Sequence, residues 1–240
     1  MLSEKPWRPE SVLRLVMWLF VSLAAGSLLI SLLNPTRGAP LTGELKYQAF
    51  LISLVTFHGV SLLLVNHLLR EHQVGWRVAF GFDAARPGRA FGLALVVACL
   101  AFPIAGQLAE WTANIMRSFA VQPEMQVAVK TLQTAETSGQ RILFGVFALG
   151  VAPFVEEVLF RGIIYPAIKQ NGYPRLAWGM TSLMFAATHS NLMTFLPLTL
   201  LALPLTWLYE RTNNLLAPIL AHSLFNAANF YWLLASQPSP

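Results

Sequence analysis

The chain has 240 residues, of which 55% are hydrophobic and only 11% are charged. A soluble domain carries about 25% charged residues. The low charge and a mean hydropathy of +0.56 therefore indicate an integral membrane protein and exclude an ordinary soluble enzyme. The net charge of +5 is expected in loops at the inner membrane face, so we do not interpret it as nucleic-acid binding. The single cysteine, Cys99, excludes an internal disulfide and a multi-cysteine metal site.

Apolar runs of suitable length predict an all-α fold, a polytopic transmembrane helical bundle of about seven spans. The expected spans cover residues 15–33, 47–69, 91–108, 142–168, 176–189, 195–209 and 215–234. The first run is too long for a signal peptide, so we expect it to be retained. The chain is divided into N-terminal spans with interfacial loops (1–141), a helical core that carries the polar motifs (142–234) and a tail (235–240).

The longest connection, residues 109–141, has apolar residues at positions 115, 116, 119 and 120 and again at 125, 127, 129 and 132. This spacing predicts two short amphipathic pieces separated at Pro123, which lie on the membrane surface or cover an entrance to a site. The loops on the side of the membrane where the N-terminus lies contain about twice as many basic residues as the loops on the opposite side. We therefore expect a multi-pass protein of a bacterial-type plasma (inner) membrane with a cytoplasmic N-terminus.

Two adjacent carboxylates, Glu156 and Glu157, lie within an apolar run that begins near Ile142. A charged side chain at membrane depth is costly unless it is paired or faces a watery cavity. On a helix, Glu157 and Arg161 are four residues apart and share a face, so they can pair. Glu156 points about 100° away from Glu157. The spacing predicts one neutralised pair and one carboxylate that is free for chemistry.

Further polar side chains lie inside the later apolar spans. His189 ends the fifth span, and Phe185 is four residues before it on the same helical face, where its ring can hold the imidazole. His222 and Asn226 are also four residues apart, so both can point at one spot. By helical rise, Glu156 and His189 lie ~18 Å, and His222 ~10–13 Å, from the inner ends of their spans. We therefore expect three helices to bring these groups to one buried cavity.

His58 and His67 in the second span allow two interpretations. Both could be metal ligands, but nine residues on a helix align them only loosely. We favour polar residues of the bundle interior or of the membrane interface.

The combination of groups suits peptide hydrolysis, although each group alone could be structural. A carboxylate in a low-dielectric site can act as a general base at neutral pH, so Glu156 is expected to take a proton from a water molecule that His189 holds. His222 and Asn226 would donate hydrogen bonds to the oxyanion. Two histidines and a glutamate can also bind a catalytic zinc ion that keeps one position open for water. Glu156, His189 and His222 as zinc ligands are therefore the alternative. The sequence contains no H-E-x-x-H zinc motif.

Three short motifs occur in order, each within a span: E-E-V-L-F-R-G at 156–162, F-A-A-T-H at 185–189 and H-S-L-F-N at 222–226. They match E-E-x-x-x-R, F-x-x-x-H and H-x-x-x-N. The chain thereby resembles the CAAX prenyl protease and bacteriocin-processing family of intramembrane endopeptidases, also called the Abi family. The match covers about residues 142 to 230.

The resemblance implies a membrane-associated peptide or protein as substrate, the lipid bilayer as environment and no nucleic-acid partner. It implies that Glu156 and His189 activate water, that His222 and Asn226 form the oxyanion site, and that Glu157 and Arg161 support the first motif. We expect glutamate-activated water without a cofactor, with zinc as the alternative. A non-catalytic immunity or scaffold protein is the rival function. A proton-coupled transporter ranks last, because no internal repeat is found.

Overall fold

The structure is a computed structural model that describes residues 2–34, 43–82, 87–133 and 137–235. Within these ranges the chain is helical and has no strand, so the predicted all-α class is confirmed. The predicted tail lies outside the described residues except for residue 235, the last residue of the final helix.

Within the described residues, seven continuous helical segments occupy the seven predicted positions. The first half of the chain forms α1 (Pro9–Leu33), α2 (Gly43–Ser53), η1 (Leu54–Gly59), α3 (Val60–Glu71), α4 (Trp76–Phe80), α5 (Pro87–Ser118) and α6 (Val127–Gln133). The second half forms α7 (Ser138–Val146), η2 (Phe147–Val151), α8 (Ala152–Glu157), η3 (Val158–Ile164), α9 (Tyr165–Gln170), α10 (Pro174–Thr188), α11 (Leu192–Thr212) and α12 (Leu216–Ala235). The three η segments are π-helical stretches inside longer continuous helices.

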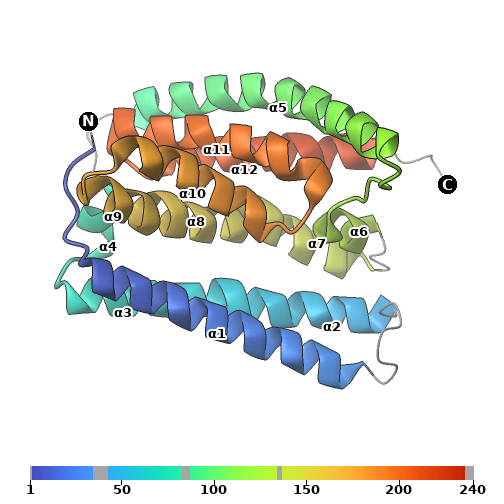
Figure 1. The fold of residues 1–240 in the computed structure, drawn as a ribbon, viewed down its shortest axis with the longest axis horizontal. Helices are drawn as coiled ribbons and strands as arrows, with labels where there is room; N and C mark the ends of the chain where they lie inside the picture. The colour runs from blue at the N-terminus through green and yellow to red at the C-terminus, as the bar shows by residue number, and fades with distance from the viewer. Residues whose placement is uncertain (1, 35–42, 83–86, 134–136, 236–240) are drawn as a thin grey trace.

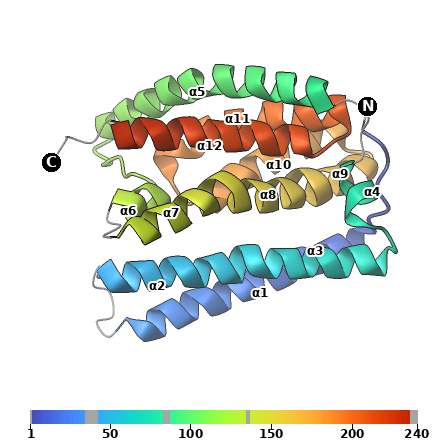
Figure 2. The same ribbon diagram turned by 180° about the vertical axis from the view of Figure 1, so that it is seen from behind.

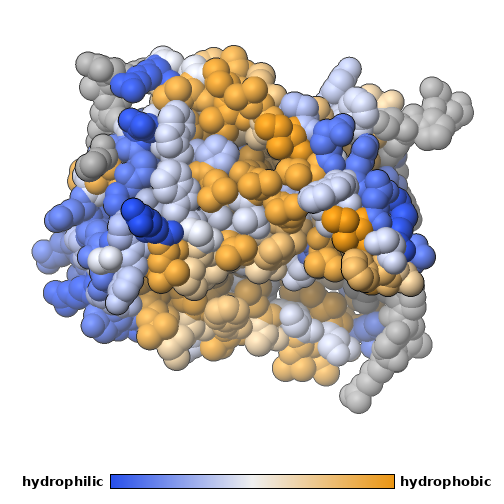
Figure 3. Space-filling model, turned by 45° about the horizontal axis from the view of Figure 1, so that its top comes forward, coloured by the Kyte–Doolittle hydropathy of each residue, from blue (hydrophilic) through white to orange (hydrophobic). Residues whose placement is uncertain are grey.

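Five helices of the described residues are long and apolar enough to cross a membrane, namely Pro9–Leu33, Glu44–Glu71, Gly88–Ser118, Ser138–Gln170 and Leu192–Thr212. The other two are α10, which has only 15 residues, and α12, which carries His222, Asn226 and Asn229. At 1.5 Å per residue α10 spans only ~22 Å, less than the ~30 Å hydrocarbon core. The surface has a wide apolar belt between two hydrophilic ends (Figure 3), as expected for an integral membrane protein.

The helices form two layers (Figures 1 and 2). In one layer, α1 packs on α2, η1 and α3 as a helical hairpin. The other layer is a bundle in which α5 packs on α11 and α12, and α10 packs on α11. The continuous segment α7–α9 packs on α10 and α12 and lies on the side of the bundle that faces the hairpin. Aromatic side chains connect the two layers, since Phe50 of α2 contacts Phe144 and Phe147 of the bundle.

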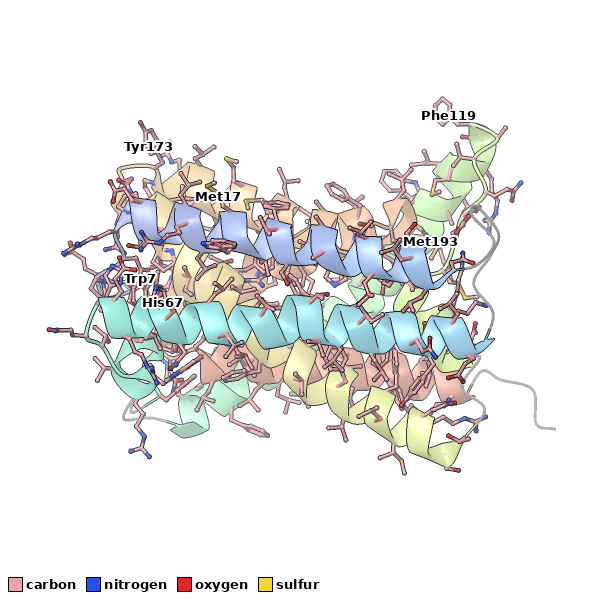
Figure 4. The ribbon with its side chains drawn as sticks, turned by 90° about the horizontal axis from the view of Figure 1, so that it is seen from below. Trp7, Met17, His67, Phe119, Tyr173 and Met193 are labelled. Atoms are coloured by element: carbon pink, nitrogen blue, oxygen red, sulfur yellow. The ribbon has the colours of Figure 1, made fainter. Side chains whose placement is uncertain are left out.

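The two layers also meet at the end of the molecule where the N-terminus lies. The indole Nε1 of Trp7 donates a hydrogen bond of 2.9 Å to the carbonyl oxygen of Gly162 in η3. This carbonyl is available because Pro166, four residues further on, has no N–H to donate to it. The buried ring of Phe80 lies against Gly162, and the Phe80 carbonyl accepts a hydrogen bond from Leu215 N. Figure 4 shows Trp7 at the same end of the hairpin as His67.

The prediction for residues 109–141 is wrong in its first half. Residues 115 and 116 are not in a separate amphipathic piece but in the last turns of α5, which continues to Ser118. Polar residues do not end a helix that extends beyond the hydrocarbon core, because its backbone hydrogen bonds are satisfied internally. The second expected piece corresponds to α6. Before α6, the backbone oxygen of Glu124 accepts a hydrogen bond from Asn191, so this segment lies against the turn between α10 and α11.

The close approach of Phe80 to Gly162 gives a test of the packing. An alanine Cβ at position 162 would lie 2.6 Å from Phe80 Cε1, so Gly162→Ala should destabilise the protein by about 1–3 kcal/mol through overpacking. The matched control is Gly179→Ala in α10, where no atom lies within 4 Å and stability should be unchanged or slightly higher. Thermal unfolding of both variants in one detergent measures the difference. Equal melting temperatures for the two variants would contradict the close packing.

Candidate active site

The buried ion pair between Glu157 and Arg161 is the centre of the candidate site. Glu157 ends α8 and Arg161 lies one turn later in η3, and their side chains are 0% and 1% exposed. Arg161 Nη1 donates to Glu157 Oε1 at 2.8 Å, and Nη2 donates to the carbonyl oxygen of Ala202 in α11 at 3.2 Å. The guanidinium carbon also lies 4.6 Å from the ring centre of Phe185. The predicted pairing at a spacing of four residues is therefore present.

His222 contacts both glutamates of the first motif. Its Nδ1 lies 3.0 Å from Glu157 Oε1, and its Nε2 lies 3.8 Å from Glu156 Oε2. Because a carboxylate beside a guanidinium only accepts hydrogen bonds, Nδ1 of His222 carries the proton of this contact. Glu156 has a side-chain exposure of 13%, against 0% for Glu157. Glu157 thus forms the buried ion pair with Arg161, and Glu156 lies near Nε2 of His222.

The ring of Phe185 contacts the histidines of the second and third motifs. Its ring centroid lies 5.0 Å from the ring centroid of His189, in a tilted contact. It lies 5.6 Å from the ring centroid of His222, in a T-shaped contact. The carbonyl oxygen of Phe185 lies 3.0 Å from His189 Nδ1, and since a carbonyl only accepts, Nδ1 is the protonated nitrogen. The Nε2 atom of His189 is therefore the one that carries a lone pair in the neutral ring. His189 follows directly after the short helix α10.

Asn226 is held by a backbone carbonyl that the π-helical segment η2 leaves unpaired. In η2 the Ala152 N–H bonds to Phe147 O, and the next residue, Pro153, has no N–H. The carbonyl of Ala148 therefore lacks its helical donors, and Asn226 Nδ2 donates to it at 2.9 Å. An amide nitrogen has two N–H groups, so a second donor remains for another acceptor.

The structure brings most of the predicted site residues together. Contacts link Glu156, Glu157 and Arg161 with His222, and they link Phe185 with Arg161, His189 and His222. Asn226, one turn after His222 on α12, is held separately through η2.

Sequence reasoning missed the two carbonyls at Ala148 and Ala202. Pro153 is the signal that indicates the first, because a proline inside a helix frees carbonyls before it. His58 lies inside the protein with both ring nitrogens buried, which agrees with the interior interpretation.

Among the described residues, no three His, Cys, Asp or Glu side chains form a group that could hold one metal ion. Glu156, His189 and His222 therefore do not form such a group in this structure, and the zinc alternative stays a prediction.

The buried polar groups come from four helices of an apolar bundle in a polytopic membrane protein. Residues 138–228 match the family model described as "Type II CAAX prenyl endopeptidase Rce1-like". The resemblance that the three motifs indicated is thereby confirmed for this segment, which contains all the candidate site residues.

Two curated proteins are similar to part of the chain. One is "Putative membrane peptidase YdiL" of Bacillus subtilis, 33% identical over 76 residues, which are 32% of this chain and 31% of the relative. The other is "UPF0177 protein YxdF" of Lactococcus lactis, 32% identical over 87 residues, which are 35% of this chain and 48% of the relative. The matched segment thus spans less than half of either relative. No solved structure is significantly similar to the chain.

The buried pair should be required for stability. Glu157→Gln removes the carboxylate that is hydrogen-bonded to the buried Arg161, so we expect a loss of about 3–5 kcal/mol in the free energy of unfolding. The control is Glu71→Gln, which removes a carboxylate whose partner, Arg14, has a side-chain exposure of 50%. Solvent screens an exposed pair, so its loss should change stability little. Unfolding in one detergent compares the variants, and equal losses would argue against a special role of the buried pair.

Proposed function

We propose that this chain is an intramembrane endopeptidase that hydrolyses a peptide bond of a membrane-associated protein or peptide by glutamate-activated water. The observation that carries the proposal is the division of roles between two adjacent carboxylates. Glu157 is fully buried and bound to Arg161 and His222 Nδ1, whereas Glu156 is partly exposed and 3.8 Å from His222 Nε2. The match of residues 138–228 to the Rce1-like family supports the same reaction class.

In the proposed mechanism, His189 orients a water molecule through Nε2, because its Nδ1 is occupied by the carbonyl of Phe185. Glu156 takes a proton from this water as the oxygen attacks the carbonyl carbon of the scissile bond. The developing oxyanion accepts hydrogen bonds from the free N–H of Asn226 and from Nε2–H of protonated His222, whose Nδ1–H is held by Glu157. The C–N bond then breaks, and Glu156 passes its proton to the leaving nitrogen, which gives a carboxylic acid and an amine and restores the Glu156 carboxylate.

The substrate class follows from the depth of the site and from the family. A peptide must reach polar groups that lie between apolar helices, so a membrane-anchored chain is favoured over a soluble one. The family description names prenylated CAAX proteins, and a prenylated C-terminal peptide is therefore one substrate to test. A lipid-free peptide of the same sequence would show whether the lipid is required.

The reaction is tested by replacing the proposed base. Glu156→Gln should lower kcat by about 10²–10⁴-fold, because general-base catalysis contributes that much, while the protein stays folded. The control is Glu110→Gln, which changes an exposed carboxylate of α5 and should keep full activity. The assay is cleavage of a library of quenched fluorogenic peptides with and without a lipid anchor, including a farnesylated CAAX peptide. Full activity of Glu156→Gln on a cleaved substrate would exclude this mechanism.

Chelation separates the water mechanism from the zinc alternative. If Glu156 activates water without a metal, cleavage should be unchanged after dialysis against a chelator, and purified protein should contain far less than one zinc per chain. Loss of cleavage on chelation that zinc restores would instead place Glu156, His189 and His222 in a metal shell. A wild type that cleaves no peptide, but whose cellular phenotype survives Glu156→Gln, would favour the immunity or scaffold function.

We also propose that the protein lies in a bacterial plasma membrane with a cytoplasmic N-terminus. Basic residues are about twice as frequent in the connections on that side, and both relatives come from bacteria. A green fluorescent protein fused to the N-terminus should therefore fluoresce, and alkaline phosphatase fused there should be inactive. The reverse pair of results would invert the topology.

A further inference from the structure

His58 projects from the hairpin layer toward the bundle that carries the proposed catalytic residues. It lies in the π-helical segment η1, and its ring packs between Phe57 and Phe147, with centroid distances of 4.7 and 4.5 Å. Both contacts are T-shaped, at 85° and 83°. Since Phe147 begins η2, His58 is a point at which the hairpin contacts the helix of the first motif.

Both ring nitrogens of His58 are buried, and neither has a hydrogen-bond partner in the part of the chain that the structure describes. An imidazole always has at least one N–H to donate, and its neutral form also has one nitrogen that accepts. Leaving them unpaired in apolar surroundings is unfavourable. The neighbouring polar side chains of the hairpin do have hydrogen-bond partners. The hydroxyl of Thr56 donates to the carbonyl of Ile52, and that of Ser61 donates to the carbonyl of Phe57. His58 is therefore a polar residue that packing alone does not explain.

The neighbours of His58 belong to the proposed machinery. Its imidazole is near enough to His189 for the two rings to interact electrostatically. Phe147, which it contacts, directly precedes Ala148, whose carbonyl holds Asn226. His58 thus approaches, from the opposite layer, both the residue that would orient water and the segment that holds an oxyanion donor.

We propose that His58 is a substrate-positioning residue whose imidazole hydrogen-bonds the backbone of the bound peptide beside the scissile bond. This inference rests on the proposed endopeptidase function. An extended peptide at membrane depth carries N–H and C=O groups that must find partners there, because no bulk water is present. An imidazole supplies a donor and an acceptor from one side chain. The peptide would lie between the hairpin and the bundle, with His58 on one side and Glu156 and His189 on the other.

The experiment compares two replacements of His58 with a matched control. His58→Phe keeps an aromatic ring between Phe57 and Phe147 but removes both hydrogen-bonding atoms. His58→Gln keeps one acceptor and one donor group on a side chain of similar reach. His67→Phe changes the other histidine of the same hairpin, which lies near Arg14 and Glu71 at the end marked by Trp7 in Figure 4. The probe is the library peptide that the wild type cleaves fastest.

We expect His58→Phe to lower kcat/KM about ten-fold through a higher KM with kcat nearly kept, because a hydrogen bond of ordinary strength to the bound peptide is lost. His58→Gln should recover most of this loss, and His67→Phe should match the wild type. In a Glu156→Gln background, binding of the uncleaved peptide, measured by fluorescence anisotropy, should weaken about ten-fold with His58→Phe. The melting temperature of His58→Phe should equal or exceed that of the wild type, because an unpaired polar ring is replaced by an apolar one.

Three results would overturn the inference. The first is an active wild type with equal kcat/KM in His58→Phe. The second is a fall in kcat with unchanged KM and unchanged peptide binding, which would place His58 on the water or on His189 instead of the peptide. The third is a lower melting temperature that His58→Gln does not restore, which would give it a packing role. Failure of the endopeptidase function itself is distinct, since the wild type would then cleave no peptide or Glu156→Gln would remain active.

Discussion

The charge of Arg161 constrains the arrangement of the bundle. A guanidinium that is 1% exposed between apolar helices is stable only if an opposite charge and hydrogen-bond acceptors surround it. The compensation comes from Glu157 on α8, the Ala202 carbonyl on α11 and the face of Phe185 on α10. His222 on α12 then joins the same carboxylate oxygen. Four helix segments must therefore keep their relative positions to satisfy one cation, and this requirement places His222 beside the glutamates and Phe185, which contacts His189, beside Arg161.

The π-helical segments supply polar groups where a regular helix would have none. A π stretch or a proline changes the pairing of backbone carbonyls, and each freed carbonyl needs another donor. In η2 that donor is Asn226, and beside Pro166 it is the indole of Trp7. In η1 the Thr56 carbonyl accepts from Ser22 of α1, so the same device also joins the two hairpin helices. The carbonyls that irregular helix segments leave unpaired thus hold polar side chains in place by hydrogen bonds. The apolar interior of a membrane protein has few other acceptors for these side chains.

Local spacing predicted the parts of the site that lie on one helix, and it failed for those that depend on distant segments. The pairing of Glu157 with Arg161 and the contact of Phe185 with His189 both follow from a separation of four residues. The partner of Asn226 is 78 residues away in sequence, so no spacing rule indicates it. The same limit applies to His58, whose neighbour Phe147 belongs to another layer. The end of α5 was misplaced because hydropathy marks where a helix leaves the hydrocarbon, not where its hydrogen bonding stops.

Charge balance connects this architecture with the proposed chemistry. With Glu156, Glu157 and Arg161 ionised, the buried group carries one net negative charge, which a doubly protonated His222 between the two carboxylates would neutralise. When Glu156 takes a proton from water and the substrate oxygen becomes an anion, the negative charge moves by a short distance but remains beside His222. The total charge of the group does not change during the step. In a low-dielectric interior, where isolated charges are expensive, such a transfer avoids most of the desolvation cost that a newly created charge would meet.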